Sequence, residues 1–184
     1  MTRNKPESKL VSIIIANRNG ENYLRTCLTS LFKSSVKDYE IIIIDNNSTD
    51  NSIEIVNEFA KKDSRIRILR NKINQGVPFS RNKAIKSALG DILVFLDNDT
   101  RVDKDWLKGI IQIFATDETI GALQCKIFDF HKPDMIQEIG MKLYSYTGFG
   151  TPLGRGEKDH GQFAKPQPIV ALGAARAVRK EIAK

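Results

Sequence analysis

The chain has 184 residues, of which 41% are hydrophobic and 28% are charged, and its formal net charge is +7. This length and apolar content suit one domain with a core and argue against a disordered chain. The excess of positive charge fits an anionic ligand, a nucleic acid or an acidic membrane surface, but Lys and Arg are scattered rather than clustered. Charge alone therefore does not choose a partner.

The cysteines and the amino terminus exclude further classes. Cys27 and Cys125 are far apart, no CxxC spacing exists and only two His are present, which argues against a Cys/His zinc site. Cys27 lies in an apolar helical pattern and is expected to pack in the core. Residues 1–8 lack the apolar run of a signal peptide, and no stretch reaches the length of a membrane span. We therefore expect a flexible amino terminus on a cytoplasmic protein.

Short apolar runs alternate with amphipathic segments through the first 128 residues. Val, Ile and Leu dominate the apolar runs, which is typical of strands buried on both faces of a parallel sheet. Repeated alternation of strand and helix predicts an α/β fold with a doubly wound, mostly parallel central sheet and flanking helices. We expect strands at 10–16, 39–44, 66–69, 92–96 and 120–128, and helices at about 21–33, 53–60, 78–88 and 105–114.

The pattern changes after residue 128. Glycines and prolines interrupt 129–168, so we expect loops and short strands there. A small strand at 169–172 and a helix at 174–184 are expected to follow, and the chain stops inside that helical pattern without a C-cap signal. We therefore expect a single domain with an α/β half at 9–128 and a segment at 129–184 that is truncated relative to the natural protein.

Polar residues close three of the predicted strands. Open α/β sheets bind ligands at the carboxyl ends of their strands. Asn17, Asp45 and Asp97 are all expected at that edge. A carboxylate such as that of Asp45 can accept a hydrogen bond from a nucleobase imide or a ribose hydroxyl. Arg81, in the first turns of a helix, can reach a phosphate or a base edge.

The strongest single motif is the acidic triplet Asp97-Asn98-Asp99, directly after an apolar strand. Two carboxylates separated by one residue can both point into a strand-end crevice. Mg²⁺ and Mn²⁺ prefer one or two carboxylates together with phosphate oxygens of a ligand. Such a triplet also occurs by chance in polar turns, but its place after a buried strand favours a metal and diphosphate site.

Several other nucleotide and hydrolase motifs are missing. The sequence contains no GxxxxGK[ST] and no GxGxxG, which argues against a P-loop NTPase and a Rossmann dehydrogenase. It contains no GxSxG, which argues against an α/β-hydrolase. Aromatic residues are not interleaved with a basic patch, so we expect no nucleic-acid partner.

Five motifs follow one another along the chain: VSIIIANRNG at 11–20, IDNNSTD at 44–50, NQG at 74–76, Arg81-Asn82 and FLDND at 95–99. Together they resemble the family 2 inverting glycosyltransferases with the GT-A fold, in their rhamnosyltransferase-like branch. The later segments 154–162 and 173–181 are similar to that branch as well, so that the resemblance covers about residue 9 to the end.

The resemblance implies a site for the nucleotide-diphosphate sugar and a role for each end of it. Asp45 and Arg81 contact the base, and Asn17, Arg18 and Asn19 line the same pocket. The acidic triplet supplies the other end: Asp97 and Asn98 lie near the ribose or sugar, and Asp99 binds Mn²⁺ or Mg²⁺ at the diphosphate. A hydroxyl of a glycan or lipid-linked acceptor then attacks the anomeric carbon in line, and a carboxylate takes its proton.

Two departures from the family pattern qualify these expectations. The family often has an aromatic residue where this chain has Arg18. Its usual general base follows the segment at 173–181, so we expect that base beyond Lys184. The alternatives are a catalytically incomplete nucleotide-sugar-binding fragment, a non-catalytic partner-binding domain and, less favoured, a nucleotidyltransferase. A basic surface would suit peripheral association with the inner face of a membrane.

Overall fold

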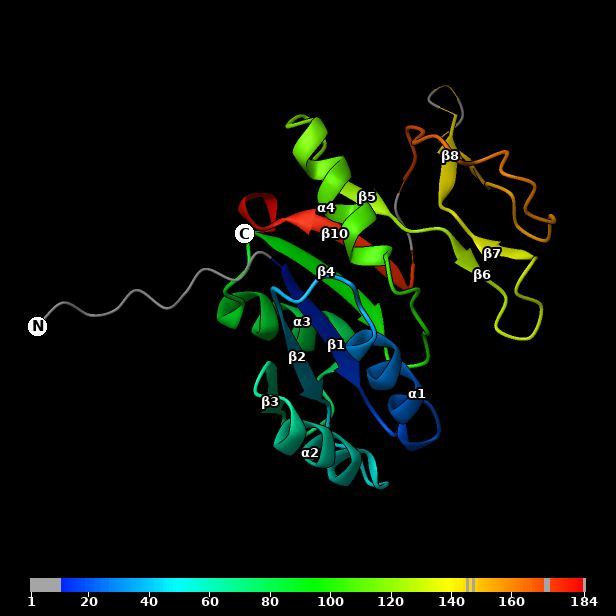
Figure 1. The fold of residues 1–184 in the computed structure, drawn as a ribbon. Helices are drawn as coiled ribbons and strands as arrows, with labels where there is room; N and C mark the ends of the chain where they lie inside the picture. The colour runs from blue at the N-terminus through cyan, green and yellow to red at the C-terminus, as the bar shows by residue number, and fades with distance from the viewer. Residues whose placement is uncertain (1–10, 145, 147, 171–172, 184) are drawn as a thin grey trace, which may run out of the picture. The chain divides into compact units, whose positions relative to one another are not determined.

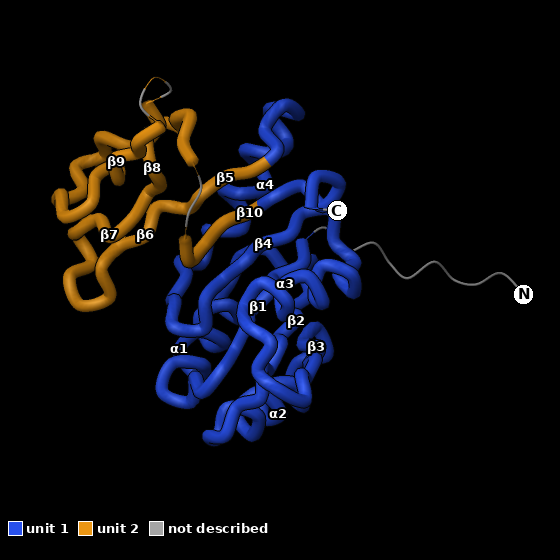
Figure 2. Tube along the Cα trace, turned by 180° about the vertical axis from the view of Figure 1, so that it is seen from behind, with its two compact units in different colours: residues 1–121, 178–184 blue, residues 122–177 orange. Residues whose placement is uncertain are grey.

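The structure is a computed structural model that describes residues 11–144, 146, 148–170 and 173–183. It divides into two compact units, which Figure 2 distinguishes by colour. The first unit comprises the chain up to Gly121 together with the residues from Val178 onward, and the second comprises Ala122–Ala177. The flexible terminus expected at 1–8, the first residue of the strand expected at 10–16, and residues 171–172 of the strand expected at 169–172 lie outside the described residues.

A parallel sheet forms the centre of the first unit (Figure 1). Its strands β1, β2 and β4 are almost entirely buried, as expected for apolar runs covered on both faces. The order β3-β2-β1-β4 places the first strand between the second and the fourth, which confirms the predicted doubly wound parallel topology. The strands are β1 (Val11–Asn17), β2 (Tyr39–Asp45), β3 (Ile66–Arg70) and β4 (Ile92–Asp97).

Four helices connect and follow these strands, close to the predicted positions. Helix α3 packs on the sheet through Ala84, which lies in a buried cluster with Ile14, Ile42 and Phe95. Cys27 is fully buried in α1, as expected from the helical pattern. The helices are α1 (Glu21–Phe32), α2 (Ser52–Lys62), α3 (Gly76–Ser87) and α4 (Trp106–Thr116). None of the helices among the described residues is long and apolar enough to span a membrane.

The helix expected at 174–184 is wrong. Ala175–Arg179 form strand β10, and Lys180–Ile182 form one 3₁₀ turn, η1. Ala175 and Ala177 are buried while the side chains between and after them are partly exposed, which is the period of two typical of a strand. The residue types favour a helix, but backbone pairing within a sheet overrides that weak preference.

The strand expected at 120–128 is also shorter than predicted, because it divides into β5 (Ala122–Gln124) and β6 (Ile127–Phe128). Strand β5 is the neighbour of β10. The remaining short strands of the second unit pair as two antiparallel ladders, as expected for a loop-rich segment. Strand β6 pairs with β7 (Ile136–Glu138), and β8 (Met141–Leu143) pairs with β9 (Gly150–Pro152).

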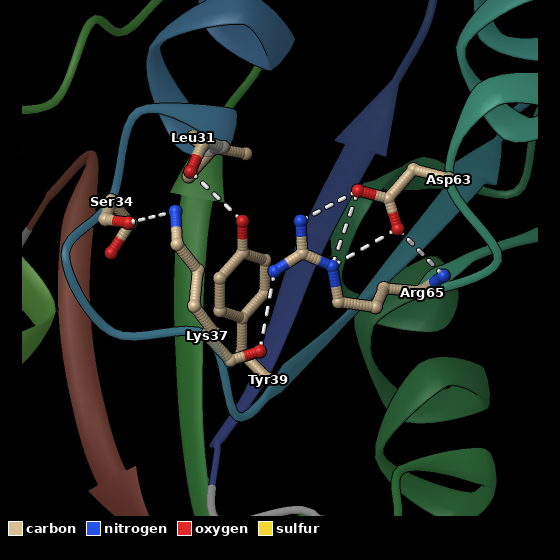
Figure 3. Close-up of polar contacts among 6 residues, drawn as sticks. All are labelled: Leu31, Ser34, Lys37, Tyr39, Asp63 and Arg65. Carbon is tan, nitrogen blue, oxygen red and sulfur yellow. Dashed lines mark hydrogen bonds and ion pairs between the residues drawn. The ribbon is translucent and has the colours of Figure 1, made fainter.

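A polar cluster holds the amino end of β2, at the edge opposite the strand carboxyl ends (Figure 3). The buried Tyr39 hydroxyl donates to the carbonyl of Leu31 at the end of α1 (2.9 Å). The Arg65 guanidinium lies 4.2 Å from the Tyr39 ring centroid and pairs with the Asp63 carboxylate (2.6 Å). This cluster joins α1, β2 and the loop before β3, and so fixes the start of the strand that carries Asp45 at its other end.

Candidate functional site

The strands end together at one edge of the parallel sheet. Asn17 pairs with Asp45 in the register of β1 and β2, and Ala16 pairs with Asp97 in the register of β1 and β4. The three predicted strand-end residues are therefore neighbours, because parallel strands with this register present their carboxyl ends side by side. Asn98 is the first residue after β4.

Asp45 is only 1% exposed, and the turn after β2 uses its carboxylate. The backbone N–H and the hydroxyl of Ser48 both donate to it (3.1 Å and 2.5 Å), and the Asn17 amide donates to it as well (3.3 Å). In this structure the Asp45 side chain therefore stabilises the strand-end turn from inside. Its predicted contact with a nucleobase stays a prediction.

The segment after β1 folds back on the same turn. Asn19 has a positive φ of 51°, a conformation that Asn tolerates better than most residues. Its backbone N–H donates to the Ser48 hydroxyl (3.0 Å), and its side-chain carbonyl accepts from the N–H of Thr49 (2.9 Å). Arg18 is exposed, and none of the described residues forms a hydrogen bond or ion pair with its side chain. Arg18 is thus available to a ligand, whereas Asn19 shapes the backbone.

The three side chains of the acidic triplet lie in different environments. Asp97, whose side chain is 45% exposed, forms an ion pair with Arg81 of α3 (2.8 Å). The Asn98 amide donates to the side-chain carbonyl of Asn17 (2.7 Å). Asp99 is exposed, and within the described part of the chain no hydrogen bond or ion pair engages its carboxylate. The structure therefore brings Arg81 to the triplet, a contact that the sequence did not predict.

The amino ends of α1 and α2 meet beside this edge. The N–H groups of Glu21 and Ser52 donate to the Asp50 carboxylate, and the N–H of Asn51 donates to the Glu21 carboxylate. Burial raises the pKa of Asp50, but hydrogen bonds from Ser52 and Glu21 outweigh it and hold the pKa below its ordinary value. The Asp50 carboxylate, which precedes α2, thus caps the start of α1, and the Glu21 carboxylate of α1 caps the start of α2.

Sequence reasoning missed a buried amide network between β2, β3 and α3. The Asn46 side-chain carbonyl accepts from the Asn71 amide (3.1 Å), and the Asn46 amide donates to Asn74 (2.7 Å). Asn71 also bonds Ser80 and accepts from the Lys83 ammonium (2.9 Å). Lys83, interpreted from the sequence as an ordinary surface charge, therefore anchors α3. The run of Asn residues at strand ends was the available signal.

The sequence matches a known protein family and curated relatives. The model of the family described as "Glycosyl transferase family 2" matches residues 12–184. An uncharacterized glycosyltransferase of Haemophilus influenzae is 39% identical over 99 residues, which cover 54% of this chain and 40% of the relative. The chain thus spans less than half the length of that curated relative.

Two solved structures are similar over 94% of this chain. S. aureus TarS in complex with UDP-GlcNAc has a TM-score of 0.67 at 23% identity, and the match covers 46% of it. A mannosyltransferase from Pyrobaculum calidifontis, PcManGT, in complex with GDP-Man and Mn²⁺ has a TM-score of 0.67 at 18% identity, and the match covers 45% of it. At these identities the likeness shows a shared fold, the GT-A-like α/β fold.

Proposed function

This chain belongs to glycosyl transferase family 2, and from that premise we propose that it binds a nucleotide-diphosphate sugar at the carboxyl edge of its parallel sheet. The bound sugar is then transferred, with inversion, to an acceptor hydroxyl. Within the family we propose the rhamnosyltransferase-like branch, which the segments at 154–162 and 173–181 resemble as well.

One observation carries this proposal: Asn17, Asp45 and the acidic triplet meet at a single strand-end edge, and Arg81 joins them from α3. A nucleotide-diphosphate sugar needs a base-binding end, a cationic or metal-binding centre for the diphosphate, and polar groups for the sugar. The edge offers acceptors, donors and a guanidinium of this kind within one unit. In support, TarS and PcManGT were solved with nucleotide sugars bound.

The base end of the donor is proposed to lie against Asp45, Arg81 and residues Asn17 to Asn19. Because the Asp45 carboxylate is buried and bonded to Ser48, a base can reach it only if the Ser48 hydroxyl turns away. Arg18 needs no such rearrangement, since its guanidinium is exposed and can stack on a base. We therefore expect Arg18 to take the place of the aromatic residue common in the family.

A divalent cation, Mn²⁺ or Mg²⁺, is proposed at the diphosphate with Asp99 as its protein ligand. Such cations are satisfied by one or two carboxylates together with phosphate oxygens and water. No group of three or more His, Cys, Asp or Glu among the described residues gathers to hold a metal by itself. When bound, the cation supplies charge neutralisation for the diphosphate leaving group.

The proposed reaction is a single displacement. The acceptor oxygen forms a bond to the anomeric carbon as the bond from that carbon to the diphosphate oxygen breaks, and the hydroxyl proton passes to a carboxylate base. We assign that base to none of the described residues. The alternative, a domain that binds the nucleotide sugar without transferring it, makes the same binding predictions and differs only in turnover.

The acceptor is proposed to be a glycan or a lipid-linked glycan, with peripheral association at the inner face of a membrane. The formal net charge of +7 favours attraction to anionic lipid headgroups. Sedimentation with vesicles of anionic and of zwitterionic lipid tests this part, and equal binding to both would contradict it.

A thermal-shift panel of UDP, GDP and dTDP, each with and without Mn²⁺, tests the donor site. At a concentration of 100 times Kd, a ligand stabilises by about 2.7 kcal/mol, which corresponds to a rise in Tm of about 5–10 °C for a chain of this size. We expect Asp99→Ala to abolish the Mn²⁺-dependent part, and Asp38→Ala, an exposed control at the amino end of β2, to retain it. The absence of a shift with every nucleotide would refute the proposal.

A further inference from the structure

A continuous line of side-chain hydrogen bonds crosses the three strand ends. The amide nitrogen of Asn17 donates to Asp45 (3.3 Å), and the amide nitrogen of Asn98 donates to the carbonyl oxygen of Asn17 (2.7 Å). The line therefore connects β2, β1 and the residue that follows β4. Asn17 is 1% exposed and Asp45 is 1% exposed, so most of this line is shielded from water.

The direction of each hydrogen bond follows from chemistry. An ionised carboxylate only accepts, so Asn17 must turn its NH₂ group toward Asp45. The Ser48 hydroxyl already donates to Asp45 and accepts from the Asn17 amide (3.2 Å), which enforces the same orientation. The Asn17 carbonyl oxygen consequently faces residue 98. That position therefore requires a hydrogen-bond donor, which Asn supplies and Asp does not.

Gly20 leaves the room for this pair. A Cβ atom at position 20 would lie 2.3 Å from the Asn17 carbonyl oxygen and 2.3 Å from the Asn98 amide nitrogen. The Asn98 amide is thus enclosed between Gly20 and Asn17. This placement suits an internal contact better than the contact with the donor sugar expected from the sequence.

The hydrogen bond also fixes the backbone of the acidic triplet. On one side, the N–H and hydroxyl of Thr100 donate to the Asp97 carbonyl, and Arg81 pairs with the Asp97 carboxylate. On the other side, Asn98 is tied to Asn17. Asp99 lies in the turn between these attachments and is itself exposed. Its direction therefore depends on the two attachments.

We propose that Asn98 is a positioning residue, which through Asn17 ties the acidic triplet to the Asp45 turn and thereby holds Asp99 in place for a divalent cation. This role rests on the proposed donor site and assigns Asn98 to holding that site rather than touching the donor. Its loss weakens the cation-assisted part of nucleotide binding and leaves the cation-independent part.

Two substitutions at position 98 separate this role from a simple effect of charge. Asn98→Asp has nearly the same shape and adds a negative charge beside the proposed cation, so charge alone predicts tighter binding of Mn²⁺. Positioning predicts the opposite, because the new carboxylate would face the Asn17 carbonyl oxygen, acceptor against acceptor. Asn98→Ala removes the hydrogen bond without adding charge. Asn57→Ala and Asn57→Asp, on the exposed face of α2, are matched controls.

The experiment is titration calorimetry of the nucleoside diphosphate that stabilises the chain most, in saturating Mn²⁺ and in EDTA. We expect Asn98→Ala to reduce the Mn²⁺-dependent gain in affinity about fivefold, the equivalent of one net hydrogen bond, with the affinity in EDTA unchanged. Asn98→Asp is expected to reduce the gain at least as much. Both Asn57 variants are expected to behave as wild type.

The possible outcomes distinguish the proposed donor site from the positioning role of Asn98. A wild-type chain that binds no nucleoside diphosphate refutes the donor site and this inference with it. A wild-type chain that binds with Mn²⁺ dependence, while Asn98→Asp binds more tightly or Asn98→Ala is unchanged, refutes the positioning role alone. A second measurement needs no ligand: the side-chain amide signal of Asn98 in a ¹H–¹⁵N spectrum is expected to move strongly in Asn17→Ala and not in Asn57→Ala, and an unmoved signal contradicts the hydrogen bond.

Discussion

Gly20→Ala is expected to destabilise the fold through a single steric conflict. The φ of Gly20 is −102°, outside the left-handed region that favours glycine, so the expected cost is steric rather than a matter of backbone conformation. The new methyl group would lie 2.3 Å from both members of the Asn17–Asn98 pair, and one or both side chains must move. Overpacking of a filled site costs about 1–3 kcal/mol, and the lost hydrogen bond adds about 1 kcal/mol.

The sum corresponds to a fall in Tm of about 5–15 °C for a chain of this size. The assay is thermal unfolding followed by circular dichroism, compared with Gly109→Ala as a matched control. Gly109 lies inside α4, and a Cβ there would meet no atom within 4 Å. The same chemical change at that position is expected to stabilise by up to about 1 kcal/mol, because glycine is a poor helix former.

We thus expect Gly20→Ala to lower the Tm and Gly109→Ala to raise it. A Gly20→Ala variant that melts at or above the wild-type temperature would show that the Asn17–Asn98 pair is not in the described position. A fall in both variants would point instead to a general intolerance of alanine, and would refute the assignment of the effect to the pair.

Three further predictions concern the two cysteines, Arg179 and Ser12. Burial raises the pKa of Cys27 to about 12 and that of Cys125 to about 11. Iodoacetamide at pH 8 is therefore expected to leave the fully buried Cys27 unlabelled until the chain unfolds, and to label the partly exposed Cys125 only slowly. These folded-state pKa values exceed the value in the unfolded chain, so the protonated thiols contribute to the free energy of unfolding fully below about pH 9, and this contribution declines as the pH rises toward 11–12. Urea unfolding at pH 8 and at pH 10 measures the decline, and equal free energies of unfolding at both pH values would contradict it. Arg179→Lys is expected to lower stability by about 1–3 kcal/mol, because the Arg179 fork donates to three carbonyls at the end of α4 and beyond, whereas an ammonium group cannot match that geometry. Ser12→Ala is expected to cost about 1–3 kcal/mol by urea titration, since the buried Ser12 hydroxyl joins Glu40 to the loop before β4, and a loss below about 0.5 kcal/mol would contradict it.

The parallel core was predictable from sequence because its signal is local. Apolar runs of five to seven residues, bounded by polar turns, place strands at positions that the structure confirms within two residues. The carboxyl ends of parallel strands meet at one edge whatever the loops do, so the neighbourhood of Asn17, Asp45 and Asp97 also followed. No knowledge of individual side-chain contacts was needed for either inference.

The carboxyl end of the chain was not predictable in the same way. Ala, Arg, Lys and Glu prefer a helix as isolated residues, but Ala175–Arg179 are selected as a strand by backbone pairing, as when Cys125 donates to the carbonyl of Ala175. The partners in such a pair lie about fifty residues apart in sequence. The helix preference of single residues does not depend on partners so far away in the sequence. Only the alternation of alanine and arginine at 175–177 could have indicated the strand.

Contacts between side chains at the candidate site were likewise beyond the sequence. That Asn98 turns to Asn17 depends on the space above Gly20, and that Arg81 reaches Asp97 depends on how α3 packs on β4. Both are consequences of packing between segments distant in sequence. The motif therefore located the residues correctly at the edge, while their partners had to come from the structure.

The three carboxylates of this edge differ in how readily a ligand can use them. Asp45 is buried and bonded to Ser48, and Asp97 is half exposed but paired with Arg81. Asp99 is exposed and, within the described residues, needs to release no hydrogen bond or ion pair to meet a cation. In the proposed function, a donor with its cation would therefore meet Asp99 first. Arg81 would turn from Asp97 to the base only afterwards, when its guanidinium fork exchanges the carboxylate for acceptors on the base edge. Positioning of Asp99 by Asn98 would thus act on the first step of binding, before any internal ion pair has to open.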